Sequence, residues 1–194
     1  MAITDWNLSL EQFLDLPEAK PALEYDPPCD GHGATVRQKM SPTAGHSALQ
    51  SAFVVLLDGL EAQGLLVRPE LRVVHGSAKV PDVCVYAEGE LKPAALRRGR
   101  YPTTPPRLAI EIRSPDEELD EQIAKCRFYT DEWGCPLALL VDPESPTPEV
   151  MAYRPQQPPH SYRDDQRIEP LFELFGLELT PSALWAKARL GPRA

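Results

Sequence analysis

Three short apolar runs constrain the fold of this chain more than any other feature of its sequence. They are residues 80–86 (VPDVCVY), 107–113 (RLAIEIR) and 136–143 (PLALLVDP). Short runs that are rich in aliphatic and β-branched residues predict buried β-strands. Between the last two runs the sequence has a helical pattern, and a strand–helix–strand connection within one sheet is right-handed and makes the two strands parallel. The sequence therefore predicts an α/β fold in which 136–143 is a central strand.

The remaining patterns place further elements around these strands. Residues 41–64 predict a helix that starts near Ser41 and ends at Gly64, and residues 65–75 predict a strand. The second helix is expected from Ser114 to about Trp133, with Gly134 just beyond its end. From His46 onward the order is helix, three strands, helix, strand, which we interpret as a mixed sheet flanked by helices. N- and C-terminal additions are predicted: a helix at 9–17, strands at 22–25, 35–40 and 149–154, and a closing apolar segment.

Composition limits the class of protein. A chain of 194 residues is expected to form a single domain over residues 1–194. No apolar run approaches the length of about 20 residues that spans a membrane, and the N-terminus lacks an export signal, so we expect a cytoplasmic protein.

The four cysteines form no CxxC pair and are expected to be reduced thiols. A net charge of -9 argues against a generally basic nucleic-acid binder. Arg97, Arg98 and Arg100 could still form a local basic patch or only a solvated charge cluster.

Two of the apolar runs each contain one carboxylate, Asp82 and Glu111. Carboxylates on neighbouring strands that face the same side can share Mg²⁺, which is typically held by one or two carboxylates together with water and substrate phosphate. Such a site suggests phosphodiester hydrolysis. Two structural interpretations stay open: Pro-Asp is a common turn dipeptide, and Glu111 could pair with Arg113 on the same strand face. If the two carboxylates are crowded together, at least one should have a raised pKa.

The order of elements, with Pro-Asp on one strand and Glu on the next, resembles the PD-(D/E)XK, or restriction-endonuclease-like, superfamily. Seven blocks resemble the Uma-type restriction endonuclease family more closely, in order over residues 22–154. They are ALEY, QKMSPTAGHSALQ, PELRV, VPDVCVY, PPRLAIEIRSP, KCRFYTDEWG and LLVDP. The resemblance implies a restriction-endonuclease-like core and cleavage of DNA that depends on Mg²⁺, or on Mn²⁺ in its place. It also implies a homodimer, since related nucleases often pair to cut two strands.

The resemblance assigns roles to four residues. Asp82 and Glu111 match the metal-binding pair. The superfamily's lysine usually stands two residues after the Glu, where this chain has Arg113. Uma-type proteins usually have an aliphatic residue there and a lysine in the following helix, which Lys125 matches. Arg113 could replace the charge of that lysine but could not accept a proton. Lys125 could instead form a surface ion pair with Glu121, four residues earlier on the helix.

Other polar residues match the family blocks with less definite roles. His46 and Gln50 lie one helical turn apart and could face the active cleft, with His46 contacting substrate or metal or else serving a structural role. Glu24 and Glu70 could support the metal pair or form ion pairs within the strands. Gln38 and Lys39 also match a family block, and the same two kinds of role are open for them.

The leading function is a Mg²⁺-dependent DNA endonuclease, with Lys125 or Arg113 as the cation that stabilises the transition state. The alternative is a catalytically silent nuclease fold that acts as a binding or assembly module. Metal binding that requires Asp82 would distinguish the first from the second. A small-molecule α/β enzyme is disfavoured because the sequence has no GxGxxG motif and no P-loop.

Overall fold

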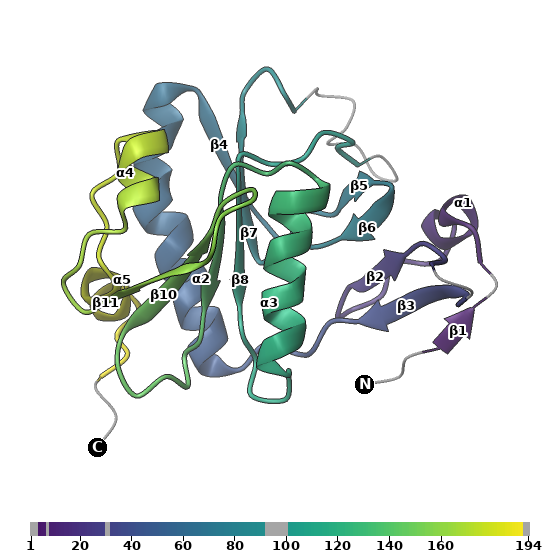
Figure 1. Cartoon of the computed structure of the whole chain (residues 1–194), viewed down its shortest axis with the longest axis horizontal. Helices are drawn as coiled ribbons and strands as arrows, with labels where there is room; N and C mark the ends of the chain where they lie inside the picture. Colours follow the sequence, from purple (N-terminus) through teal and green to yellow (C-terminus); the bar gives the residue numbers. More distant parts are fainter. Residues whose placement is uncertain (1–3, 7, 30–31, 92–100, 192–194) are drawn as a thin grey trace.

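The centre of the molecule is a six-stranded sheet with helices on both faces (Figure 1). The computed structural model describes residues 4–6, 8–29, 32–91 and 101–191. The strand order is β11-β10-β9-β8-β7-β4, and only β8 and β9 are parallel. These strands are β4 (Leu65–Pro69), β7 (Val83–Ala87), β8 (Leu108–Ile112), β9 (Ala138–Val141), β10 (Glu149–Tyr153) and β11 (His160–Arg163). The mixed sheet, the central position of β9 and its parallel pairing with β8 confirm the predicted fold class.

Helices from different parts of the chain cover the two faces of this sheet. Helix α2 (Ala44–Leu57) continues into the 3-10 helix η1 (Asp58–Gln63), and it lies on one face with α4 (Glu169–Phe175) and α5 (Pro181–Ala188). Helix α3 (Leu119–Arg127) continues into the π-helix η3 (Phe128–Glu132) and covers the other face.

Alternation along β8 determines which face each of its side chains reaches. Ile110 and Ile112 pack in the core under α2, whereas Ala109 packs in the core under α3. Because side chains alternate along a strand, Glu111 belongs to the α3 face together with Ala109. The strand therefore directs this carboxylate toward the residues of α3.

A second, antiparallel sheet of five strands lies beside the first, with the order β1-β3-β2-β6-β5. Its strands are β1 (Thr4–Trp6), β2 (Leu23–Asp26), β3 (Ala34–Gln38), β5 (Val73–His75) and β6 (Ser77–Lys79). Helix α1 (Leu10–Leu14) packs on this sheet through Phe13, and a capping box formed by Ser9 and Gln12 starts it. The hairpin β5–β6 is inserted between β4 and β7, so the chain leaves the large sheet after Pro69 and returns to it at Val83.

Several predicted boundaries were wrong. The single strand expected at 65–75 is two strands in different sheets, separated by a turn in which Glu70 has a φ of 48°. Asp82 precedes β7 rather than lying within it. The helix expected from Ser114 begins only at Leu119, because Ser114–Glu117 forms a turn closed by a 3.0 Å backbone hydrogen bond. Its end at Trp133, with Gly134 in the left-handed region, was predicted correctly.

The structure also bears on the predicted start of the first long helix, the state of the cysteines, the basic cluster and the membrane-span prediction. Helix α2 starts after Thr43, which caps it, and not at Ser41. All four cysteines are free, and three of them are buried. The basic cluster of Arg97, Arg98 and Arg100 lies outside the described residues. Within the described parts of the chain, no helix is long and apolar enough to cross a membrane. The single-domain organisation stays a prediction.

Candidate active site

A cleft of about 940 Å³ opens where the segments after β3 and before β7 meet the end of β8. Asp82 and Glu111 both line this cleft, although they are only 1% and 2% exposed. The two carboxylates that the sequence singled out therefore face one common space. His46 and Glu70 line it as well, together with Lys39.

The Asp82 carboxylate is held from three directions. Lys39 Nζ lies 2.6 Å from Oδ1, while His46 Nε2 lies 3.2 Å from Oδ2, and the backbone N–H of Ile112 donates to Oδ2 at 2.7 Å. Burial alone would raise the pKa of Asp82. The charge of Lys39 and the hydrogen bond from His46 outweigh burial and hold that pKa well below its usual range. Asp82 is therefore ionised at neutral pH.

The backbone of Asp82 is fixed as well. Gln50 Nε2 donates to its carbonyl oxygen at 2.9 Å, and the backbone N–H of Glu70 donates to the same oxygen at 3.1 Å. His46 and Gln50, one turn apart on α2, thus both reach Asp82, one through its side chain and one through its carbonyl. The Glu70 side chain is exposed at the wall of the cleft.

The Glu111 carboxylate has a different environment. Tyr129 OH donates to Oε1 at 2.7 Å, and Lys125 Nζ donates to Oε2 at 3.1 Å. Burial raises the pKa of Glu111 to about 7, with Lys125 opposing the rise and the negative charges of Asp82 and Glu24 adding to it. Glu111 is thus the carboxylate whose pKa the sequence predicted to be raised by crowding.

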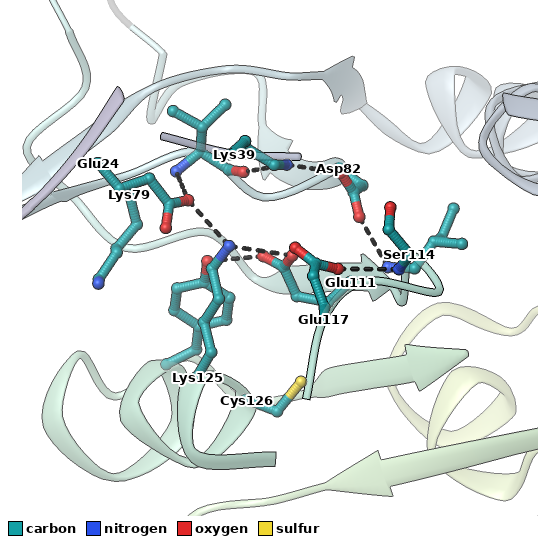
Figure 2. A network of polar contacts seen from close by, with 12 residues as sticks. Glu24, Lys39, Lys79, Asp82, Glu111, Ser114, Glu117, Lys125 and Cys126 are labelled. Atoms are coloured by element: carbon teal, nitrogen blue, oxygen red, sulfur yellow. Dashed lines mark hydrogen bonds and ion pairs between the residues drawn. The ribbon is translucent and has the colours of Figure 1, made fainter. Parts of the chain in front are cut away.

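Lys125 connects Glu111 to the five-stranded sheet. Figure 2 shows its side chain rising from α3 between two carboxylates, with Nζ 2.8 Å from Glu24 Oε1 and 3.1 Å from Glu111 Oε2. Glu24 Oε1 also accepts the backbone N–H of Val80 at 2.9 Å. Burial favours neutral Glu24, but Lys125 and other nearby lysines lower the pKa of Glu24 to about 2. Because Lys125 pairs with Glu24 and Glu111 and its side chain is only 12% exposed, its interpretation as a surface partner of Glu121 is wrong.

Arg113 points elsewhere. It forms an ion pair with Asp142 Oδ2, and its Nε donates to the carbonyl oxygen of Glu117 at 3.2 Å. The suggested salt bridge from Arg113 to Glu111 is therefore not the reason for a carboxylate in this strand. The structure brings Asp82, Glu111, Lys125, His46, Gln50 and Glu24 into one network and directs Arg113 away from it.

Two members of the network were not given their roles from the sequence. Tyr129 was not singled out from the sequence, although it lies four residues after Lys125 and hence on the same helical face. Lys39 was treated as a minor case, yet it is the cation paired with Asp82. The two residues are 43 positions apart, and no local pattern connects them.

The donor set fits a hard divalent cation. A carboxylate offers about four lone-pair positions, and the contacts above occupy three on Asp82 and two on Glu111, so acceptor capacity remains on both. Among the described residues, no three His, Cys, Asp or Glu side chains form a metal-binding group. Two carboxylates at an open cleft suit Mg²⁺, which keeps several waters, better than a closed all-protein site such as structural zinc.

The family model Uma2, described as "Putative restriction endonuclease", matches residues 10–182 of the chain. The chain belongs to this family. The Uma2 match includes every residue of the network around Asp82 and Glu111. A solved structure from Anabaena variabilis ATCC 29413, described as "a putative nuclease belonging to DUF820", is 28% identical with a TM-score of 0.75. The alignment covers 93% of this chain and 99% of that one. No curated protein matches the chain. The Uma2 family and this neighbour support a nuclease function.

Proposed function

We propose that the chain is a Mg²⁺-dependent endonuclease that hydrolyses phosphodiester bonds of DNA, with Mn²⁺ able to replace Mg²⁺. The observation that carries this proposal is the pair of buried carboxylates, Asp82 and Glu111, which face one cleft and are each held by a lysine. The Uma2 family match supports the reaction class.

Asp82 and Glu111 would hold the cation, which when bound would polarise a phosphoryl oxygen and lower the pKa of a bound water. Lys39 and His46 keep Asp82 ionised and oriented at neutral pH. Tyr129 fixes the orientation of the Glu111 carboxylate through its 2.7 Å hydrogen bond. These residues thus prepare the two carboxylates before substrate arrives, which lowers the cost of organising the site during the reaction.

Lys125 is the proposed transition-state cation. It touches Glu111 and is buried beside the cleft, whereas Arg113 is bound to Asp142. A preorganised positive charge stabilises the negative charge that builds on the phosphate oxygens during attack. Glu24 acts as a positioning residue, because its ion pair of 2.8 Å fixes the ammonium group of Lys125.

Cleavage of single-stranded circular DNA and of supercoiled plasmid DNA tests the proposal. Wild-type protein should cut at least one of these substrates with Mg²⁺ or Mn²⁺ and stop when EDTA is added, and Glu111→Gln should be inactive. A matched control is Glu121→Gln, which changes a carboxylate on α3 outside the network and should cleave as wild type does.

A protein that neither binds Mg²⁺ in calorimetry nor nicks DNA would favour the binding or assembly module. One observation agrees with that module: each of the two carboxylates already has a lysine as its ion-pair partner. The homodimer is proposed from the resemblance alone, and sedimentation velocity would test it. The cytoplasmic location stays a prediction.

A further inference from the structure

Arg72 is a cation in the wall of the cleft that has no carboxylate partner among the described residues. It directly precedes β5 and lines the same cleft as Asp82. Its Nη1 donates to Tyr101 OH and its Nη2 donates to the carbonyl oxygen of Leu23, both at 3.2 Å. These acceptors are neutral, so the charge of the guanidinium is not compensated by them. By contrast, Arg113 is neutralised by Asp142.

The guanidinium of Arg72 is also fixed in place. Its Cζ lies 5.4 Å from the ring centroid of Phe13 and 5.1 Å from that of Tyr101. A guanidinium has five N–H donors in a rigid fork, and the two bonds above leave further donors available. An arginine held in this way is prepared to bind the oxygens of a phosphate.

Arg72 lies within reach of the proposed scissile position. The backbone N–H of Glu70 is bonded to the carbonyl oxygen of Asp82 at 3.1 Å. Arg72 follows two residues later, and two residues of chain span at most about 7 Å. Asp82 and Arg72 are therefore close enough to contact phosphates of the same strand that are near neighbours.

The dimensions of the site favour a single strand. A cleft of about 940 Å³ is comparable to pockets that enclose a small ligand, and the carboxylates in it are only 1% and 2% exposed. Double-stranded DNA is stiff. For one of its phosphates to enter the cleft, the second strand would have to fit past both cleft walls. The net charge of -9 also offers little of the general attraction on which duplex binding depends.

We propose that the cleft binds an unpaired DNA strand and that Arg72 holds a phosphate adjacent to the one that is cleaved. This inference rests on the proposed nuclease function for the identity of the substrate, and it adds the substrate class and a residue that selects it.

Fluorescence anisotropy tests the inference. A labelled oligonucleotide is titrated with protein, alone and annealed to its complement, over a range of salt concentrations. Ca²⁺ replaces Mg²⁺, and gels check that the oligonucleotide stays intact. Wild-type protein should bind the single strand more tightly than the duplex. Arg72→Met should weaken binding of the single strand about tenfold, as expected for loss of a charged hydrogen bond. It should also make the slope of log K against log salt shallower by about 0.7, the value for one phosphate contact.

Two further variants separate charge from structure. Arg72→Lys should keep the salt slope and recover part of the affinity. Arg68→Met removes an arginine of β4 whose one hydrogen bond to a described residue goes to the carbonyl oxygen of its neighbour Val67, and it should behave as wild type. If Arg72 only supports Phe13 and Tyr101, Arg72→Met would lower the melting temperature and leave the salt slope unchanged, which would overturn the assignment of Arg72.

Tighter or equal binding of the duplex would overturn the single-strand assignment. The nuclease proposal is tested separately from this result. Strand binding with the Arg72 salt effect but without cleavage in Mg²⁺ or Mn²⁺ would refute only the nuclease proposal. Cleavage by a protein in which Arg72→Met keeps the wild-type salt slope would refute only the present inference.

Discussion

Replacement of Glu111 by Gln should remove a pH dependence of stability that this buried carboxylate imposes on the metal-free protein. Burial raises the pKa of Glu111 from 4.5 to about 7. Between these two values the folded protein binds more protons at this site than the unfolded chain does. The free energy of unfolding must therefore fall as the pH rises through this window.

The size of the fall follows from the pKa of Glu111. A change from 4.5 to about 7 corresponds to about 3 kcal/mol, at about 1.4 kcal/mol for each pKa unit. Asp82 and Glu24 act in a separate window. Because their pKa values are lowered, the stability that they contribute is present above about pH 4.5 and is lost as the pH falls. Stability of the metal-free protein should therefore be greatest near pH 5.

Urea unfolding in EDTA at several pH values from 5 to 8 measures this effect. The wild-type free energy of unfolding should fall by about 3 kcal/mol over the range, and that of Glu111→Gln should fall much less. Glu121→Gln controls for loss of a carboxylate from α3 and should keep the wild-type fall. Identical pH profiles for wild type and Glu111→Gln would refute the account of Glu111 as a carboxylate destabilised by its surroundings.

The remaining predictions concern the cations. Lys125→Met should reduce cleavage by about a hundredfold or more, measured well below its melting temperature, whereas Arg113→Leu should cleave within a few-fold of wild type. The reverse pattern would assign the catalytic charge to Arg113. Lys39→Met should lower the free energy of unfolding by about 3 kcal/mol at pH 7 in urea titrations, because Asp82 would stay buried without its ion-pair partner. A loss below about 0.5 kcal/mol would show that His46 and the backbone suffice to hold Asp82.

Most of the large sheet could be predicted from the sequence because its strands are marked by local patterns, but the edge strand β11 was not predicted. The apolar runs at β8 and β9, with the helical pattern of α3 between them, determine a parallel pair in which Glu111 faces α3. The five-stranded sheet was harder to predict from the sequence. Residues 65–75 read as one continuous strand, and nothing in their alternation shows that the chain turns at Glu70 and enters a different sheet.

The site was predictable to a similar degree. The carboxylates Asp82 and Glu111 stood out because they interrupt apolar runs, although Asp82 lies at a bend just before its strand rather than inside it. The partners of these carboxylates depend on contacts between distant segments. Lys39 reaches Asp82 from the position just after β3, and Glu24 reaches Lys125 from β2, so neither pair leaves a periodic signal in the sequence.

Anomalous diffraction from a crystal soaked in Mn²⁺ would show whether Asp82 and Glu111 hold a metal ion together. We expect one strong peak in the cleft, coordinated by carboxylate oxygens of both Asp82 and Glu111, and loss of that peak in Asp82→Ala. A peak that is bound elsewhere, or no peak at a saturating concentration of Mn²⁺, would contradict the claim that these two buried carboxylates form a metal-dependent nuclease centre.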